Sequence, residues 1–163
     1  MRKVLSVIGV FILLLSFTSA YNAQKIDSKI NSFAPNILIS DNDSSFTLSK
    51  LRGKFVLLSF WSSTDAESRI RNIMSYKTSV DMNNKNLVFA SVNYDSNKSL
   101  FDEIIKIDNV DKSSQFFDKD GINSETYKQF HLEDGFKSYL INREGKIVAV
   151  NPSMDNLTKL LSQ

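Results

Sequence analysis

Residues 46–68 read FTLSKLRGKFVLLSFWSSTDAES, and no other segment of the chain carries a more informative pattern. Within it, Phe55–Trp61 is apolar at every position but one, and polar residues stand on both sides of the run. A run of this length between polar residues is typical of a strand buried on both faces. Thr64 and Glu67 fit a capping box, so we expect a helix to follow the strand directly, with Thr64 as its N-cap.

The helix expected after Thr64 has apolar residues at helical spacing. We expect them to form a stripe that faces the core, while the charged positions between them face water. This stripe consists of Ala66, Ile70, Ile73, Met74 and Val80.

On both sides of this strand and helix, the sequence predicts further strands and helices that alternate. Strand-like runs around a polar turn predict an N-terminal hairpin, and Gly145 lies in the turn of a second hairpin, where we expect a positive φ. The predicted elements are a hairpin of 36–40 and 45–48 around 41–44, strands 87–92 and 115–117, helices 97–107 and 123–130 (capped by Asn123 or Ser124), a hairpin of 138–142 and 146–150, and a helix after Pro152. This order predicts a single α/β domain, with a central mixed sheet covered by helices on both faces.

The N-terminus has the features of a secretory signal peptide. Two basic residues precede the apolar run Val4–Phe17, which has 14 residues. That is shorter than the roughly 20 residues that span a bilayer core. Small residues follow, so we expect cleavage after Ala20 or after Ala23. An uncleaved N-terminal anchor is the alternative.

This prediction divides the chain into a signal peptide (1–20), a leader segment (21–34) and one folded domain (35–163). We therefore expect a protein exported to the periplasm or secreted, with no stable membrane anchor after cleavage. The whole chain has 20 basic and 18 acidic residues, and both basic residues of 1–20 leave with the signal peptide. The mature chain is then neutral, so we expect no nucleic-acid partner.

The chain contains no cysteine. This excludes disulfides, zinc–thiolate sites, iron–sulfur clusters and every thiol nucleophile. The one histidine, His131, has no neighbouring residues at metal-ligand spacing, so we expect it to be structural or exposed. We expect neither a metal nor a cofactor.

Two segments resemble a known family. Residues 34–61, which include APNIL and FTLSKLRGKFVLLSFW, are similar to the opening of exported thioredoxin-like thiol–disulfide oxidoreductases of the TlpA/ResA type, within the redoxin and AhpC/TSA-like group. Residues 139–147, YLINREGKI, resemble the strand, turn and strand that follow the cis-proline of that family. The likeness extends over about residues 34–150 and implies a thioredoxin-like fold.

The same resemblance places the family's active-site positions on residues of other types. The two cysteines of the family's Cys-x-x-Cys motif fall on Asp65 and Ser68, and its cis-proline falls on Phe136. Thiol–disulfide exchange needs one thiolate to attack sulfur and a second thiol to resolve the mixed disulfide. Asp65 cannot do either, and Ser68 has no evident general base to activate it. Dithiol redox activity is therefore excluded.

From this combination we expect a non-catalytic module that binds an extended peptide or an exported protein through Trp61, Asp65, Ser68 and Phe136. Several alternatives remain open: Asp65 and Ser68 as helix-capping residues only, Trp61 as a residue at the rim of the core, and a surface with no specific partner. The chain could also be an enzyme of non-thiol chemistry, for example with Asp65 near His131, or an accessory of a cysteine-bearing redox partner.

Overall fold

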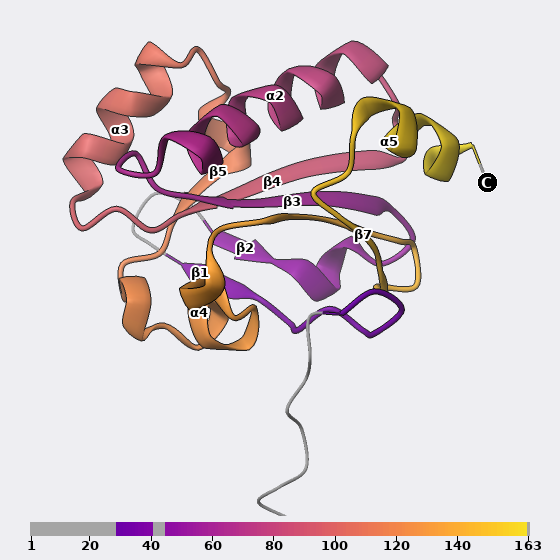
Figure 1. Ribbon diagram of the computed structural model, residues 1–163, viewed down its shortest axis with the longest axis horizontal. Helices are drawn as coiled ribbons and strands as arrows, with labels where there is room; N and C mark the ends of the chain where they lie inside the picture. The colour runs from indigo at the N-terminus through magenta and orange to yellow at the C-terminus, as the bar shows by residue number, and fades with distance from the viewer. Residues whose placement is uncertain (1–28, 41–44, 163) are drawn as a thin grey trace, which may run out of the picture.

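The computed structural model describes residues 29–40 and 45–162, which form a five-stranded sheet with helices on either side (Figure 1). The predicted signal peptide, residues 21–28 of the leader and the hairpin turn 41–44 lie outside the described residues. The strand order is β5-β4-β3-β6-β7. The strands are β3 (Phe55–Trp61), β4 (Leu87–Asn93), β5 (Gln115–Phe117), β6 (Ser138–Ile141) and β7 (Ile147–Val150).

The sheet is mixed, as expected from the sequence. Strands β3, β4 and β5 are parallel, whereas β6 is antiparallel to β3 and β7 is antiparallel to β6. Gly145, in the turn between β6 and β7, has a φ of +88°, which confirms the positive φ expected there.

Helices cover both faces of the sheet, which confirms the predicted α/β architecture (Figure 1). On one face lie α2 (Ala66–Met82), α3 (Lys98–Ile107) and α5 (Met154–Leu161). On the other lie α4 (Glu125–Gln129) and the predicted N-terminal hairpin, formed by β1 (Leu38–Ser40) and β2 (Ser45–Thr47). Short 3₁₀ turns occupy Leu48–Leu51, Lys112–Ser114, Gly121–Asn123 and Leu132–Asp134. Among the described residues, no helix has the length and apolar character needed to cross a membrane.

The last residues of the expected leader belong to the folded domain. The Asn31 N–H donates to the carbonyl of Ile147 at 2.7 Å, and the Ala34 N–H donates to the carbonyl of Gly145 at 2.9 Å. Ala34 itself is buried. The domain therefore starts at or before Asn31 rather than at residue 35, because this segment hydrogen-bonds along β7 and the turn before it.

The hydrophobic core differs between the two faces of the sheet. The face toward the hairpin and α4 carries one continuous cluster that includes Ile37, Phe46, Phe60, Phe130 and Tyr139. The opposite face carries two separate clusters. One lies near α5 and includes Leu57, Leu140 and Leu157; the other lies near α3 and includes Trp61, Phe101, Ile105 and Phe117.

A row of polar side chains separates these two clusters. Gln115, Ser91, Ser59 and Ser138 are direct neighbours across β5, β4, β3 and β6, and all four are buried. The Ser138 hydroxyl donates to that of Ser59 at 3.2 Å. Helix α2 lies above this polar row, and its Asn72 side-chain amide donates to Gln115 at 3.2 Å.

The polar row explains why the predicted inward stripe of α2 is wrong. The residues of α2 that are buried against the sheet are Ser68 and Asn72. Ile70, Met74 and Val80 are more than half exposed, Ala66 is exposed and Ile73 is half-buried. A helix above buried serine and glutamine side chains needs polar groups on its inner face, because buried polar atoms require hydrogen-bond partners.

Candidate functional site

The loop between β3 and α2 is held by a buried carboxylate. Asp95, two residues after β4, is 4% exposed and accepts hydrogen bonds from the Ser62 hydroxyl at 2.6 Å and the Ser63 N–H at 2.7 Å. Its other carboxylate oxygen accepts from the side chain of Asn93 at 3.0 Å. Asp95 was not predicted from the sequence, although an aspartate just beyond the carboxyl end of a buried strand is a usable signal for a role at that edge of the sheet.

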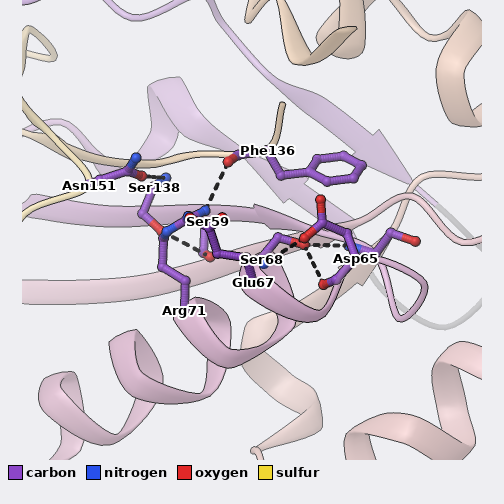
Figure 2. Close-up of polar contacts among 9 residues, drawn as sticks. Ser59, Asp65, Glu67, Ser68, Arg71, Phe136, Ser138 and Asn151 are labelled. Carbon is purple, nitrogen blue, oxygen red and sulfur yellow. Dashed lines mark hydrogen bonds and ion pairs between the residues drawn. The ribbon is translucent and has the colours of Figure 1, made fainter. Parts of the chain in front are cut away.

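Asp65 rather than Thr64 is the N-cap of α2, so the predicted cap is wrong by one residue. The Asp65 carboxylate accepts the Ser68 N–H at 2.9 Å (Figure 2). The Thr64 hydroxyl instead lies 2.9 Å from the hydroxyl of Ser62. Asp65 therefore has the structural capping role that was the alternative to a binding role, and its half-buried side chain remains accessible.

Ser68 is enclosed beneath the start of α2. It is 1% exposed. Its hydroxyl donates to the carbonyl of Asp65 at 3.0 Å and accepts the Ser62 N–H at 3.3 Å. Both partners are backbone groups, and neither can act as a general base for this hydroxyl. Ser68 therefore holds the turn together and is not an activated nucleophile.

The loop before β6 is fastened to α2 by Arg71. The Arg71 guanidinium donates to the carbonyl of Phe136 at 2.8 Å and forms an ion pair with Glu67, one turn earlier on the same helix (Figure 2). Gly135 precedes Phe136 with φ +104° and ψ 151°, a conformation that is essentially restricted to glycine. The Phe136 ring is half-buried and stacks on Tyr94, with ring centroids 5.8 Å apart. Burial raises the pKa of Tyr94 far above its ordinary value.

A groove of about 240 Å³ lies between the first turns of α2 and this loop. Asp65, Glu67 and Arg71 form one wall, and the loop 134–137 with Asn151 forms the other. The groove lies at the end of the polar row, because Asn151 accepts the Ser138 N–H at 2.8 Å (Figure 2). Its lining contains both acidic and basic side chains and one aromatic ring.

The structure brings two of the four expected binding residues to this groove. Asp65 and Phe136 line it. Trp61 is fully buried, with its ring 6.2 Å from that of Phe101, so it lies inside the core and neither in the groove nor at the rim of the core. Ser68 is also buried. Neither Trp61 nor Ser68 is therefore accessible to a ligand.

His131 is not part of the groove lining. Its Nδ1 lies 3.3 Å from the Glu133 carboxylate, and its backbone is left-handed, with a φ of +51°. Asp65 is engaged with the Ser68 N–H instead. The arrangement of Asp65 beside His131 that a hydrolase would require is therefore not present. Within residues 29–40 and 45–162, no group of three histidine, aspartate or glutamate side chains is placed to hold a metal ion.

No family model matches the chain, and no curated protein matches it. Among solved structures, a thioredoxin-like protein from Parabacteroides distasonis is 36% identical, with a TM-score of 0.72 over 84% of this chain and 98% of that chain.

Two further solved structures share the fold. The thioredoxin domain of a thiol–disulfide oxidoreductase from Bacteroides vulgatus is 24% identical, with a TM-score of 0.69 over 82% of this chain and 96% of that chain. A thiol–disulfide oxidoreductase from Bacteroides fragilis is also 24% identical, with a TM-score of 0.67 over 80% of this chain and 98% of that chain. The chain therefore belongs to the thioredoxin-like family, and it has no cysteine.

Proposed function

We propose that this chain is an exported, non-catalytic member of its family that binds an extended peptide segment of another exported protein. The observation that carries the proposal is the groove between α2 and the loop before β6, which is open although no thiol is present. The resemblance places the first redox cysteine and the cis-proline of the family on Asp65 and Phe136, which line this groove, and the second cysteine on Ser68, which is buried. A binding surface without electron transfer is the function that this combination supports best.

The groove suits a polar, extended segment. Its two walls come from separate parts of the fold, which Arg71 joins through the carbonyl of Phe136, so the walls are held at a fixed separation. Lys137 and Asp134 are the charged groups on the loop side, and Asp65, Glu67 and Arg71 are those on the helix side. A peptide with charges of both signs would find partners on both walls, and the half-buried ring of Phe136 offers an apolar contact.

Export forms part of the same proposal and rests on the pattern of residues 1–20. The test is fractionation of bacteria that express the chain, followed by mass spectrometry of the N-terminus. Cleavage is expected to leave Tyr21 or Gln24 as the first residue. A chain that keeps Met1 and stays in the cytoplasm would overturn the export proposal and leave the binding proposal to its own test.

The absence of redox catalysis is tested by insulin reduction with dithiothreitol. The wild-type chain should give the same rate as a variant carrying Asp65→Ala and Ser68→Ala, and the same rate as dithiothreitol alone. A wild-type rate above that of the variant would overturn the non-catalytic assignment.

Binding is tested with carboxymethylated α-lactalbumin, a permanently unfolded chain without free thiols, as the probe of extended segments. In ¹⁵N-labelled protein, the probe should shift the amide signals of Asp65, Arg71 and Phe136, and Lys137→Glu or Asp134→Lys should weaken binding about tenfold. Lys159→Glu, on the exposed surface of α5, is the matched charge control and should have no effect. Shifts confined to other surfaces, or no binding in the millimolar range, would overturn the proposal.

A further inference from the structure

The outer face of α2 carries exposed apolar side chains, although nothing in the described structure covers it. Ile70 is 57% exposed and Met74 is 63% exposed, one turn apart on the same side of the helix. Beside them, Ala66 and Ile73 line a shallow cavity of about 360 Å³ that reaches Asp108 at the end of α3. In Figure 1, α2 runs along the outside of the helical layer, and no labelled element lies over its outer side.

The exposed apolar side chains of α2 are not what holds the helix on the domain. Polar contacts hold the helix to the domain through the Asp65 cap, the amide of Asn72 on Gln115, and Arg71 on Phe136. Its apolar contacts with the core come from Tyr76, whose ring lies 5.9 Å from that of Phe89, and from Met82. Arg69 adds an ion pair with Asp108 that joins α2 to α3, and its hydrogen bonds to Asp108 raise the pKa of Arg69. These contacts fix the rotation of α2 and direct its apolar side chains toward solvent, where exposed apolar patches commonly mark interaction surfaces.

We propose that this face is the interface of a symmetric dimer, in which α2 packs antiparallel against α2 of a second copy of the chain. A two-fold axis reverses the direction of the second helix, so residues that face each other must be placed symmetrically about one point of the sequence. Ile70 and Met74 have residue 72 as their midpoint. Glu67 and Lys77 have the same midpoint.

A single two-fold axis at the level of residue 72 therefore fits both pairs of residues. It places Ile70 opposite Met74 of the second copy, and Glu67 at the same height as Lys77 of the second copy. The Glu67 side chain is 85% exposed, and Lys77 is exposed as well. Each contact occurs twice by symmetry, so the face is complementary to itself both in apolar character and in charge.

The shallow cavity beside Ile70 gives the dimer a specific apolar contact. Met74 of the second copy reaches the level of this cavity, and an unbranched methionine side chain adapts well to a shallow hollow. A helix of 17 residues is about 25 Å long and about 10 Å wide, so two such faces bury on the order of 500 Å². This area is below that of standard specific interfaces, so we expect a weak dimer, with a dissociation constant of about 100 µM.

The dimer inference stands apart from the peptide-binding proposal, because its test uses the chain alone. The molar mass of the purified chain is measured by light scattering and sedimentation from about 1 µM to about 500 µM. The wild type should rise from one chain mass toward two, and Ile70→Glu or Met74→Glu should remain at one. Both substitutions replace exposed side chains, so circular dichroism should show unchanged folding.

Charge exchange tests the two-fold geometry itself. Glu67→Lys and Lys77→Glu should each weaken the dimer about tenfold, because each places like charges opposite each other. The double exchange should restore the dimer to within about threefold of wild type. A wild-type chain that stays at one mass at every concentration, or a dimer that Ile70→Glu leaves intact, would overturn the inference. A dimer that both single charge variants weaken and the double variant does not restore would overturn the antiparallel arrangement.

Discussion

Asp65 stands at the helix N-terminus, the location where an anion is most favourable. Its carboxylate accepts the Ser68 N–H, and the positive end of the α2 dipole stabilises its charge. The same field stabilises a thiolate where a cysteine occupies such a position. A helix N-terminus that would lower the pKa of a thiol is therefore present here. The side chain at this position is instead a carboxylate, which has no redox chemistry.

Two cysteines placed at these positions should form a disulfide. In the double variant Asp65→Cys, Ser68→Cys, the two residues are three apart at the start of a helix, a separation within disulfide reach. Loss of the Asp65 cap should destabilise the reduced form by about 0.5–2 kcal/mol. Mass spectrometry after oxidation and alkylation should show an intramolecular bond, and Asp65→Cys alone is the control. If no such bond forms, the alignment of Asp65 and Ser68 with the family's cysteines is out of register. Insulin reduction should remain slow because the resemblance assigns Phe136 to the position of the family's cis-proline.

Gly145 has a backbone conformation that side chains disfavour. Its φ is +88°, and an added Cβ would lie 1.6 Å from the Arg52 guanidinium, which would have to move away. Because that guanidinium is the end of a flexible side chain, most of the penalty is backbone strain. We expect Gly145→Val to lower the free energy of unfolding by about 1–2 kcal/mol, measured by urea denaturation. Gly145→Asn should cost less, since asparagine tolerates positive φ. An unchanged melting temperature for the valine variant would contradict the expectation.

At the scale of elements, the sequence predicted strands better than it predicted the faces of helices. The apolar run Phe55–Trp61 identified β3 with its bounds, and the turn around Gly145 identified the second hairpin. The face of α2 was predicted wrongly because apolar periodicity shows which residues share a face and not which face meets the sheet. The polar side chains of Ser59, Ser91 and Ser138 determine which face of α2 meets the sheet. They form one row only when β3 pairs with β4 and β6.

The polar row leads to a prediction of opposite effects for two serines. The Ser91 hydroxyl is buried and has no hydrogen-bond partner among the described residues, whereas the Ser59 hydroxyl accepts that of Ser138. Ser91→Ala should therefore raise the free energy of unfolding by about 1 kcal/mol, and Ser59→Ala should lower it by about 1 kcal/mol. Chemical denaturation of both variants beside wild type measures the difference. A clear loss of stability in Ser91→Ala would mean that this hydroxyl is hydrogen-bonded in solution.

At the scale of the whole molecule, the candidate site was predictable only in part. Asp65 and Phe136 were found because the resemblance to a family fixed their positions in the chain, and both line the groove. Arg71 and Asp95 were missed, since their roles depend on contacts with Phe136 and Ser62, 65 and 33 residues away in the sequence. No local pattern encodes contacts between such distant segments.

Acid should weaken the packing of α3 against the 3₁₀ turn at Lys112–Ser114. Hydrogen bonds from the Ser113 N–H and hydroxyl lower the pKa of Asp111. Burial raises the pKa of Asp102, but hydrogen bonds from Lys98 and Lys112 outweigh it, so the net shift is downward. A carboxyl group whose pKa is lower in the folded state stabilises the fold above its unfolded value, near 4, and loses this contribution as the pH falls through the folded value.

The free energy of unfolding should therefore fall as the pH drops from about 5 to about 2, and part of this fall should come from Asp102 and Asp111. In Asp102→Asn and Asp111→Asn no carboxyl group can be protonated at these positions, so each variant should be less stable than wild type at neutral pH and closer to it in acid. Urea denaturation at pH 7 and pH 3 measures the two gaps. Asp155→Asn, in the exposed first turn of α5, is the matched control variant. A gap between wild type and Asp111→Asn that is equal at both pH values would show that Ser113 does not favour the ionised form of Asp111.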